Sequence, residues 1–169
     1  GEFSKRRKIS PLNLVSVETI YKFIKPVFDV AQFSPECNVI ALVYVNRLLA
    51  FTKMPLHSNN WRPLTLIALL LAQKVWDDRC LANQDFPLIW KAVLGQRTAD
   101  ECPLTLSTVN KLERNFLELL MYNVTVSSSL YARYYFELRS LCAQNRFEFT
   151  LEALTPEQAV RLEVKSIST

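Results

Sequence analysis

The stretch Leu64–Asp78, LTLIALLLAQKVWDD, decides how the rest of the chain must be arranged. Eight of its first nine residues are apolar, so the segment has no polar face, and it is too long for a typical strand. It is also far shorter than the roughly 20 apolar residues that are needed to cross a bilayer. We therefore expect a helix that is buried on all sides and wrapped by its neighbours. A single cation, Lys74, lies near the point where this helix leaves the core.

The overall composition is that of an ordinary globular domain. The chain has 169 residues, of which 50% are hydrophobic and 21% are charged, enough for one domain with its own core. With only two glycines, a sheet with tight hairpins is disfavoured and a glycine-rich phosphate loop is ruled out. The net charge of +4 comes partly from the cluster Lys5–Lys8, so charge does not argue for nucleic-acid binding.

Residues that catalyse reactions or bind metals are sparse in this sequence. None of the four cysteines forms a C-x-x-C pair, and the single histidine, His57, has no nucleophile or carboxylate beside it. We therefore expect reduced thiols in an intracellular protein, with no metal site, no cofactor and no small-molecule ligand. Clustered histidines, a G-x-S-x-G motif and a phosphate loop are missing, so an enzyme is not expected.

The first residues of the chain are polar and basic. We expect residues 1–12 to form a flexible arm. Gly1-Glu2-Phe3 looks like a cloning scar, so the natural chain is expected to begin earlier, where it could carry a lipid-anchor motif. Ser10 follows Arg7 at a spacing that basophilic kinases accept, which makes it a phosphorylation candidate; the alternative is a solvated tail. The sequence predicts no signal peptide and no membrane span.

Two predicted helices precede the buried one. Ser16 can cap a helix with an apolar stripe over residues 20–31, in which Pro26 is expected to cause a kink. Ser34-Pro35-Glu36 predicts the start of a second helix, which runs to about Phe51 and is apolar on most sides. Two consecutive helices of this kind favour an all-α fold with a central helix surrounded by others, over an up-and-down bundle.

Further helical patterns follow the buried segment, and no strand pattern is evident. They predict helices that begin after Asp85, at Thr105 or Ser107, at Ser127–Ser129 and at Thr155, and that end near Gly95, Asn123, Asn145 and Lys165. The polar segment over residues 96–103 is expected to be a loop.

Three segments resemble, in order and spacing, the helix signatures of the cyclin box. Tyr44–Leu49, YVNRLL, resembles the signature of the second helix of that family. Leu69–Asp78, LLLAQKVWDD, resembles the third-helix signature, in which leucines and alanine precede a lysine. Asn110–Leu120, NKLERNFLELL, resembles the fourth-helix signature, which is centred on a glutamate, here Glu113. The resemblance implies an all-α fold with a single five-helix cyclin box and short flanking helices.

The amino-acid sequences of three segments are similar to those of one branch of that family, cyclin Y and its relatives. These proteins are themselves similar to the phosphate-regulon cyclins. These segments are Lys74–Asp78, Phe116–Leu120 and Tyr134–Leu141, and the resemblance covers about residues 18–162. It predicts a cyclin box over residues 13–150, followed by a short helix and tail over residues 151–169.

The sequence also departs from other cyclins. Relative to cyclin Y, an insertion falls within Ala92–Leu104. Asn46 stands where many cyclins have an aspartate. Val17–Ile24 lacks the arginine-containing motif by which cell-cycle cyclins recruit substrates, so recruitment by that route is not expected.

The resemblance implies a non-catalytic subunit that binds and activates a cyclin-dependent kinase of the PCTAIRE/PFTAIRE or phosphate-regulon type, with a role in the cell cycle and cell division. It implies that Lys74 and Glu113 pair at the kinase interface, with Trp76, Asp77 and Asp78 beside them. From the residues alone, Lys74 would be read as a solubilising side chain at the end of an apolar helix, and Glu113 as a solvated one. Trp76 could equally belong to the core.

One alternative function remains at this stage, a cyclin-fold adaptor for transcription or nucleic-acid-associated assemblies. It would need a basic face and salt-sensitive binding to DNA. Charge is nearly balanced outside the arm, so no nucleic acid is expected as a partner. The expected location is intracellular, in the cytoplasm, the nucleus or both, with peripheral membrane association only through a lipid anchor that this sequence lacks.

Overall fold

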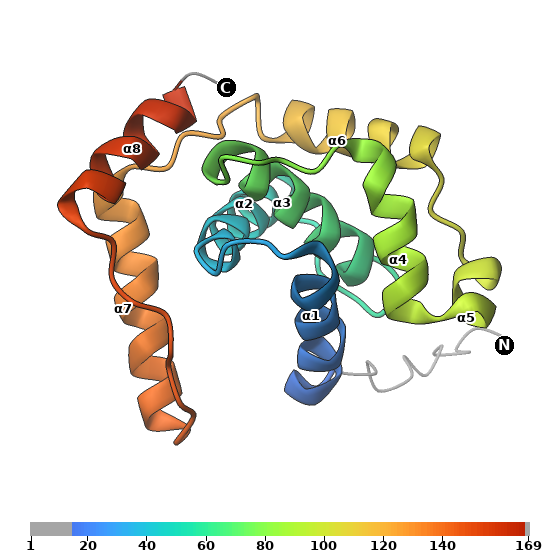
Figure 1. Ribbon diagram of the computed structural model, residues 1–169, viewed down its shortest axis with the longest axis horizontal. Coiled ribbons are helices and arrows are strands. Elements are labelled where there is room, and N and C mark those ends of the chain that lie inside the picture. Colours follow the sequence, from blue (N-terminus) through green and yellow to red (C-terminus); the bar gives the residue numbers. More distant parts are fainter. Residues whose placement is uncertain (1–14, 168–169) are drawn as a thin grey trace, which may run out of the picture.

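Most of the stretch Leu64–Asp78 lies in helix α3, Trp61–Trp76, of the computed structural model, which describes residues 15–167. All eight residues from Leu66 to Gln73 are buried, which confirms the prediction of a core helix without a polar face. Figure 1 shows α3 in the middle of the fold, and α2, α6 and α8 lie against it. The predicted basic arm over residues 1–12, including Ser10, lies outside the described residues.

Over residues 15–167 the fold is all-α, as predicted, with eight α-helices, one short 3-10 turn and no strand. The elements are α1 Val17–Ala31, α2 Cys37–Thr52, α3 Trp61–Trp76, the 3-10 turn η1 Asn83–Asp85, α4 Phe86–Leu94, α5 Gln96–Glu101, α6 Leu106–Leu119, α7 Ser128–Gln144 and α8 Pro156–Ile167. None of these helices is both long enough and apolar enough to span a membrane.

Four of the predicted helix starts are confirmed by hydrogen bonds of the capping side chains. The hydroxyls of Ser16, Thr105 and Ser127 each accept from the backbone N–H three residues ahead at 3.1 Å, and that of Thr155 does so at 3.2 Å. The predicted start at Ser34 is wrong, because α2 begins at Cys37 after a turn and Ser34 does not cap it. Its backbone N–H instead donates to the carboxylate of Asp77, at 3.3 Å.

The loop predicted over residues 96–103 is also wrong, since most of it forms α5. This short helix is held by side-chain pairs one turn apart, Gln96 with Asp100 at 2.8 Å and Arg97 with Glu101 at 3.4 Å. Only Ala99 is buried in it, so its polar composition gave no helical stripe to detect. The region of the predicted insertion is therefore folded.

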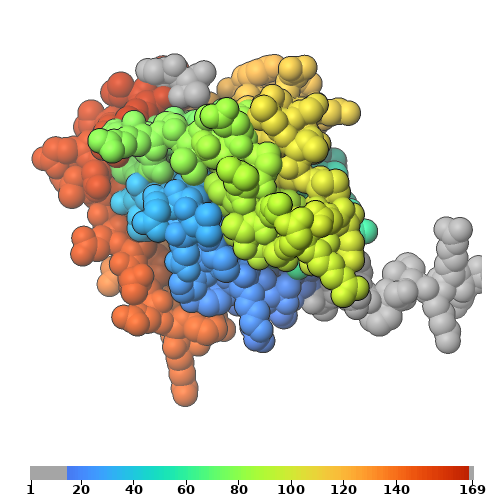
Figure 2. Space-filling model, turned by 45° about the vertical axis from the view of Figure 1, so that its right-hand side comes forward, coloured from blue at the N-terminus to red at the C-terminus, as the bar shows by residue number. Residues whose placement is uncertain are grey.

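Aromatic side chains join the outer helices to α3. Phe23 of α1 makes edge-to-face contacts with Trp61 at the start of α3 and with Trp90 of α4, at centroid distances of 5.3 and 6.0 Å. α1 consequently lies beside α4, and Figure 2 shows the two on one face together with α5. α1 continues through Pro26 to Ala31.

The last two helices lie at one side of the fold (Figure 1). α7 buries Tyr131 and Tyr135 in its first half, whereas nearly all of residues 139–148 are exposed. The chain then returns along α7, held where the Tyr135 hydroxyl donates to the main-chain oxygen of Leu151 at 2.9 Å. This return brings α8 against α3.

Candidate functional site

Lys74 and Glu113 lie together in the fold although 39 residues separate them in the sequence. Lys74 is in the last turn of α3, Glu113 is in the middle of α6, and α6 packs against α3. The Lys74 Nζ donates to Glu113 Oε1 at 2.6 Å. The two side chains are 32% and 17% exposed. The pair is therefore partly shielded from water and still accessible from one side.

Two asparagines complete this cluster. Asn83 Oδ1 accepts from Lys74 Nζ at 2.8 Å, and Asn83 Nδ2 donates to Glu113 Oε2 at 2.6 Å. Asn83 Nδ2 also donates to Asn110 Oδ1, at 2.8 Å. We call Lys74, Asn83, Asn110 and Glu113 the polar cluster. It joins α3, η1 and α6 through charge-assisted hydrogen bonds.

Sequence reasoning missed both asparagines. Asn110 lies three residues before Glu113, so helical spacing alone places it on the same face of α6 and could have identified it. Asn83 lies in the three-residue turn η1, where no periodic pattern exists. Its position depends on the path of the connection between α3 and α4, which local sequence does not specify.

That connection is held by Gln73, which is fully buried. The Gln73 Nε2 donates to the main-chain oxygen of Leu81 at 3.0 Å, and the Leu81 N–H donates to Gln73 Oε1 at 2.9 Å. The N–H of Ala82 donates to Asp85 at 2.8 Å. These bonds fix the backbone on either side of η1, so Asn83 reaches the ion pair from a defined position.

The three predicted site residues that follow Lys74 are not part of the polar cluster. Trp76 is only 2% exposed, and the Arg161 guanidinium of α8 covers its ring at 4.2 Å from the centroid. Trp76 therefore lies in the core, which is one of the two positions that the sequence left open for it, and its contact with a kinase stays a prediction.

The two acids also have partners elsewhere in the chain. Asp77 accepts from the Ser34 N–H at 3.3 Å and from the Cys37 thiol at 3.7 Å, at the start of α2. Asp78 pairs with Lys165 of α8 at 2.8 Å and with Arg161 at 3.6 Å. The hydrogen bond and the charge of Lys165, with the charge of Arg161, hold the pKa of Asp78 below its usual value. The last residues of the stretch Leu64–Asp78 thus contact α2 and α8.

The side chains of the polar cluster suit the binding of a partner. The cluster offers an ammonium, two amides and a carboxylate, which can donate to and accept from the backbone of a partner. Within residues 15–167, no group of three or more His, Cys, Asp or Glu side chains could hold a metal ion. His57 is exposed in the loop before α3, where its Nδ1 accepts from the Asn59 N–H at 3.3 Å.

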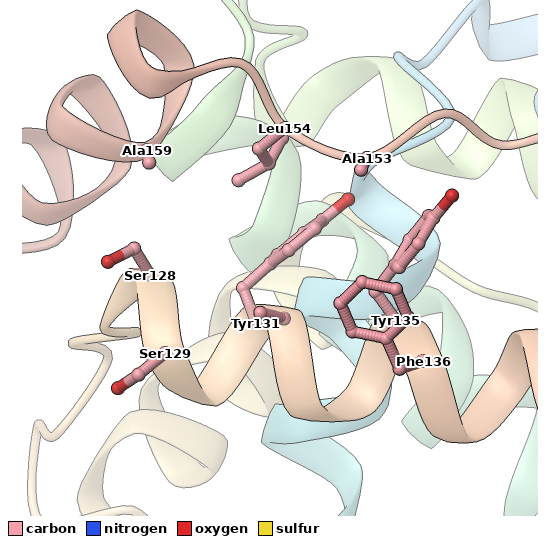
Figure 3. A pocket seen from close by; sticks show the side chains of 9 residues that line it. Ser128, Ser129, Tyr131, Tyr135, Phe136, Ala153, Leu154 and Ala159 are labelled. Carbon is pink, nitrogen blue, oxygen red and sulfur yellow. The ribbon is translucent and has the colours of Figure 1, made fainter.

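A pocket of about 420 Å³ lies elsewhere, between the first half of α7 and the chain that enters α8. Figure 3 shows Tyr131, Tyr135 and Phe136 on one side of it and Ala153 and Leu154 on the other. No charged side chain lines it. Its polar side chains are the hydroxyls of two serines and two tyrosines, and it contains none of the predicted site residues.

Comparison with known proteins identifies one family. The family described as Cyclin, N-terminal domain, matches residues 6–125. This range contains every helix from α1 to α6 and the whole polar cluster, and it ends before α7. No solved structure matches the chain with significant similarity.

Proposed function

The chain belongs to the family of cyclin N-terminal domains, and on this premise we propose that it is the regulatory subunit of a cyclin-dependent kinase, which it binds and activates. Its all-helical architecture is that of a cyclin box. Cyclins are in general regulatory proteins without chemistry of their own. In that role the protein would hold the mobile kinase helix that carries a glutamate for the ATP-binding lysine, and so favour the active kinase.

The observation that carries the proposal is the pairing of Lys74 with Glu113 at 2.6 Å on two adjacent helices. The ammonium has three donors, of which Glu113 and Asn83 occupy two, so a further donor remains for a partner. Partial exposure of both side chains leaves them accessible while limiting screening by water. We propose that this pair bonds the kinase backbone beside the mobile helix and fixes its register.

Apolar side chains can supply the remaining contact area. Leu117 lies one helical turn beyond Glu113 on the same side of α6. Just past the end of the helix, Met121 and Tyr122 are exposed with left-handed backbone conformations, at φ of 53° and 57°. Interfaces combine an apolar centre, often with Tyr and Met, with polar groups at the edge. We propose that this end of α6 and the polar cluster form one docking surface.

We place the protein in the cyclin Y-like branch and its kinase in the PCTAIRE/PFTAIRE or phosphate-regulon class. The proposal is supported by the similarity of three segments to that branch, Lys74–Asp78, Phe116–Leu120 and Tyr134–Leu141. The last of these lies in α7, outside the matched range, so it is an independent likeness. An intracellular location would follow from a partner of this class.

The test is co-expression with a kinase of the PCTAIRE/PFTAIRE class and, separately, with one of the phosphate-regulon class, with measurement of the dissociation constant and of phosphorylation of a generic substrate. We expect a stable complex and kinase activity above that of the kinase alone. Replacing both Lys74→Ala and Glu113→Ala should weaken binding at least tenfold, because charge-assisted bonds to the partner are lost.

The matched control is the exposed pair of α1, Lys25 and Asp29, which lie 2.7 Å apart. Its double alanine variant should bind the kinase as tightly as the unmodified protein. If the Lys74 and Glu113 variant binds equally well, the docking surface is misassigned. If the unmodified protein binds no kinase of either class, the proposed partner is wrong.

A further inference from the structure

The side-chain amide of Asn83 contacts both members of the Lys74–Glu113 pair. Its oxygen accepts from Lys74 at 2.8 Å, and its nitrogen donates to Glu113 at 2.6 Å. Lys74 bonds one carboxylate oxygen of Glu113, and Asn83 bonds the other. The amide therefore closes a ring of three hydrogen bonds around the ion pair.

Only a neutral group with one acceptor and one donor can occupy this position without conflict. The reverse orientation of the amide would set its NH2 group against the ammonium and its oxygen against the carboxylate. The second hydrogen of Asn83 Nδ2 is directed to Asn110 Oδ1 at 2.8 Å, so both amide hydrogens have acceptors. A side chain with every polar atom bonded has one orientation, and it restricts the groups it bonds.

The backbone around Asn83 is equally restrained. Gln73, the residue before Lys74, bonds both backbone groups of Leu81 from a fully buried position. Asp85, at the other end of η1, accepts from the Ala82 N–H. Asn83 is thus attached to α3, the same helix that carries Lys74, by a route independent of its own side chain.

We propose that Asn83 is a positioning residue that holds Lys74 and Glu113 in the arrangement that binds the kinase; this inference rests on the proposed function. A lysine and a glutamate have long side chains, and ordering them on binding reduces affinity. The amide orders them before the kinase arrives. Gln73 contributes indirectly, because its bonds to Leu81 fix the position of η1, the turn that carries Asn83.

The first test compares Asn83→Ala with Gln84→Ala, using the PCTAIRE-class kinase of the test above. Gln84 is the exposed neighbour of Asn83 in the same turn, so its variant controls for changes to η1. We expect Asn83→Ala to raise the dissociation constant about tenfold and Gln84→Ala to leave it within twofold. In a Lys74→Ala background, Asn83→Ala should add less than twofold, because it acts through the pair.

The second test uses Asn83→Asp, which keeps the size and shape of the side chain. Its carboxylate would face the carboxylate of Glu113 across the 2.6 Å contact, with Lys74 on α3 and Asp85 in the turn as the other charged neighbours. We expect weaker binding than with alanine at about pH 7.5 and partial recovery at about pH 5.5, where two adjacent carboxylates share a proton. A space-filling role would predict normal affinity and no such recovery.

These outcomes separate the two proposals. If the unmodified protein binds the kinase and Lys74→Ala weakens binding, but Asn83→Ala behaves like Gln84→Ala, the positioning role is wrong while the docking surface stands. If Lys74→Ala has no effect, the docking surface itself is wrong.

A third test needs no kinase and measures the side-chain amide resonance of Asn83 by NMR. Lys74→Met and Glu113→Gln should each shift this resonance, and Gln84→Ala should not. Unshifted amide signals in both variants would overturn the ring of hydrogen bonds.

Discussion

Lys165 of α8 donates to the main-chain oxygen of Trp76, the last residue of α3, at 3.0 Å and across 89 residues of sequence. The same ammonium donates to Asp78 at 2.8 Å. The final carbonyl groups of a helix lack partners within the helix and carry partial negative charge, so a cation there is stabilising. The helix that carries Lys74 is therefore capped by the last helix of the described chain.

Removing this cap should destabilise the fold. We expect Lys165→Ala to lower the free energy of unfolding by about 1–2 kcal/mol, because a charged hydrogen bond to a helix terminus is lost. Urea denaturation followed by circular dichroism measures the change. Lys111→Ala, which removes an exposed cation from α6, is the control and should change stability by less than about 0.5 kcal/mol. Equal stability of the two variants would show that neither the bond to Trp76 nor the pair with Asp78 contributes to stability.

The contact between Lys165 and Asp78 also predicts that the stability of the fold depends on pH. Lys165 and Arg161 hold the pKa of Asp78 below its usual value. A carboxyl of this kind stabilises the fold above its unfolded pKa of about 3.9, and the contribution is lost as the pH falls through the lower folded value. We therefore expect Asp78→Asn to lose less stability than the unmodified protein between about pH 5 and pH 2.5.

Unfolding in urea at several pH values would measure that difference. Asp100→Asn is the control, since Asp100 is an exposed acid of α5 that pairs with Gln96 and not with Lys165 or Arg161. Its effect on the pH dependence of stability should be smaller than that of Asp78→Asn. If the free energy of unfolding of Asp78→Asn falls with pH in parallel with that of the unmodified protein, the prediction is wrong.

The resemblance to cyclins implied the pairing of Lys74 and Glu113, which the structure contains. The contacts of Trp76, Asp77 and Asp78 with α8 and the start of α2 could not be inferred from the sequence. Positions two apart on a helix point in different directions, so Trp76 cannot share the face of Lys74. Asp78 lies beyond the end of α3. Lys165 lies 87 residues from Asp78, so no local pattern could place α8 there. The core of α3 was predictable because burial on all sides leaves a continuous apolar run.

The cysteines should differ sharply in reactivity. Cys37 is buried at the start of α2, where burial and the nearby Asp77 raise the pKa of its thiol. The thiolate is the reactive form, so a raised pKa and lack of access both slow reaction. We expect a thiol reagent such as DTNB to label the exposed Cys80 and Cys102 in the folded protein and Cys37 only on unfolding. Mass spectrometry of labelled peptides identifies the sites, and labelling of Cys37 at the rate of Cys102 would contradict its burial.

The contacts of Trp76 and Asp78 predict a separation of stability from binding. Trp76→Phe removes part of a buried ring beneath Arg161, and Asp78→Asn weakens the contact with Lys165, so both should lower the free energy of unfolding. The loss should be about 1–3 kcal/mol for Trp76→Phe. No hydrogen bond or ion pair joins either residue to the polar cluster, so at a temperature where each variant is folded the kinase should bind within twofold of its normal affinity. Lys74→Ala should show the opposite pattern, with affinity reduced about tenfold and stability changed by less than about 1 kcal/mol, since the pair is partly exposed. Calorimetric titration and urea denaturation of the same samples measure both quantities. A loss of affinity in Asp78→Asn as large as that in Lys74→Ala would extend the docking surface to the end of α3.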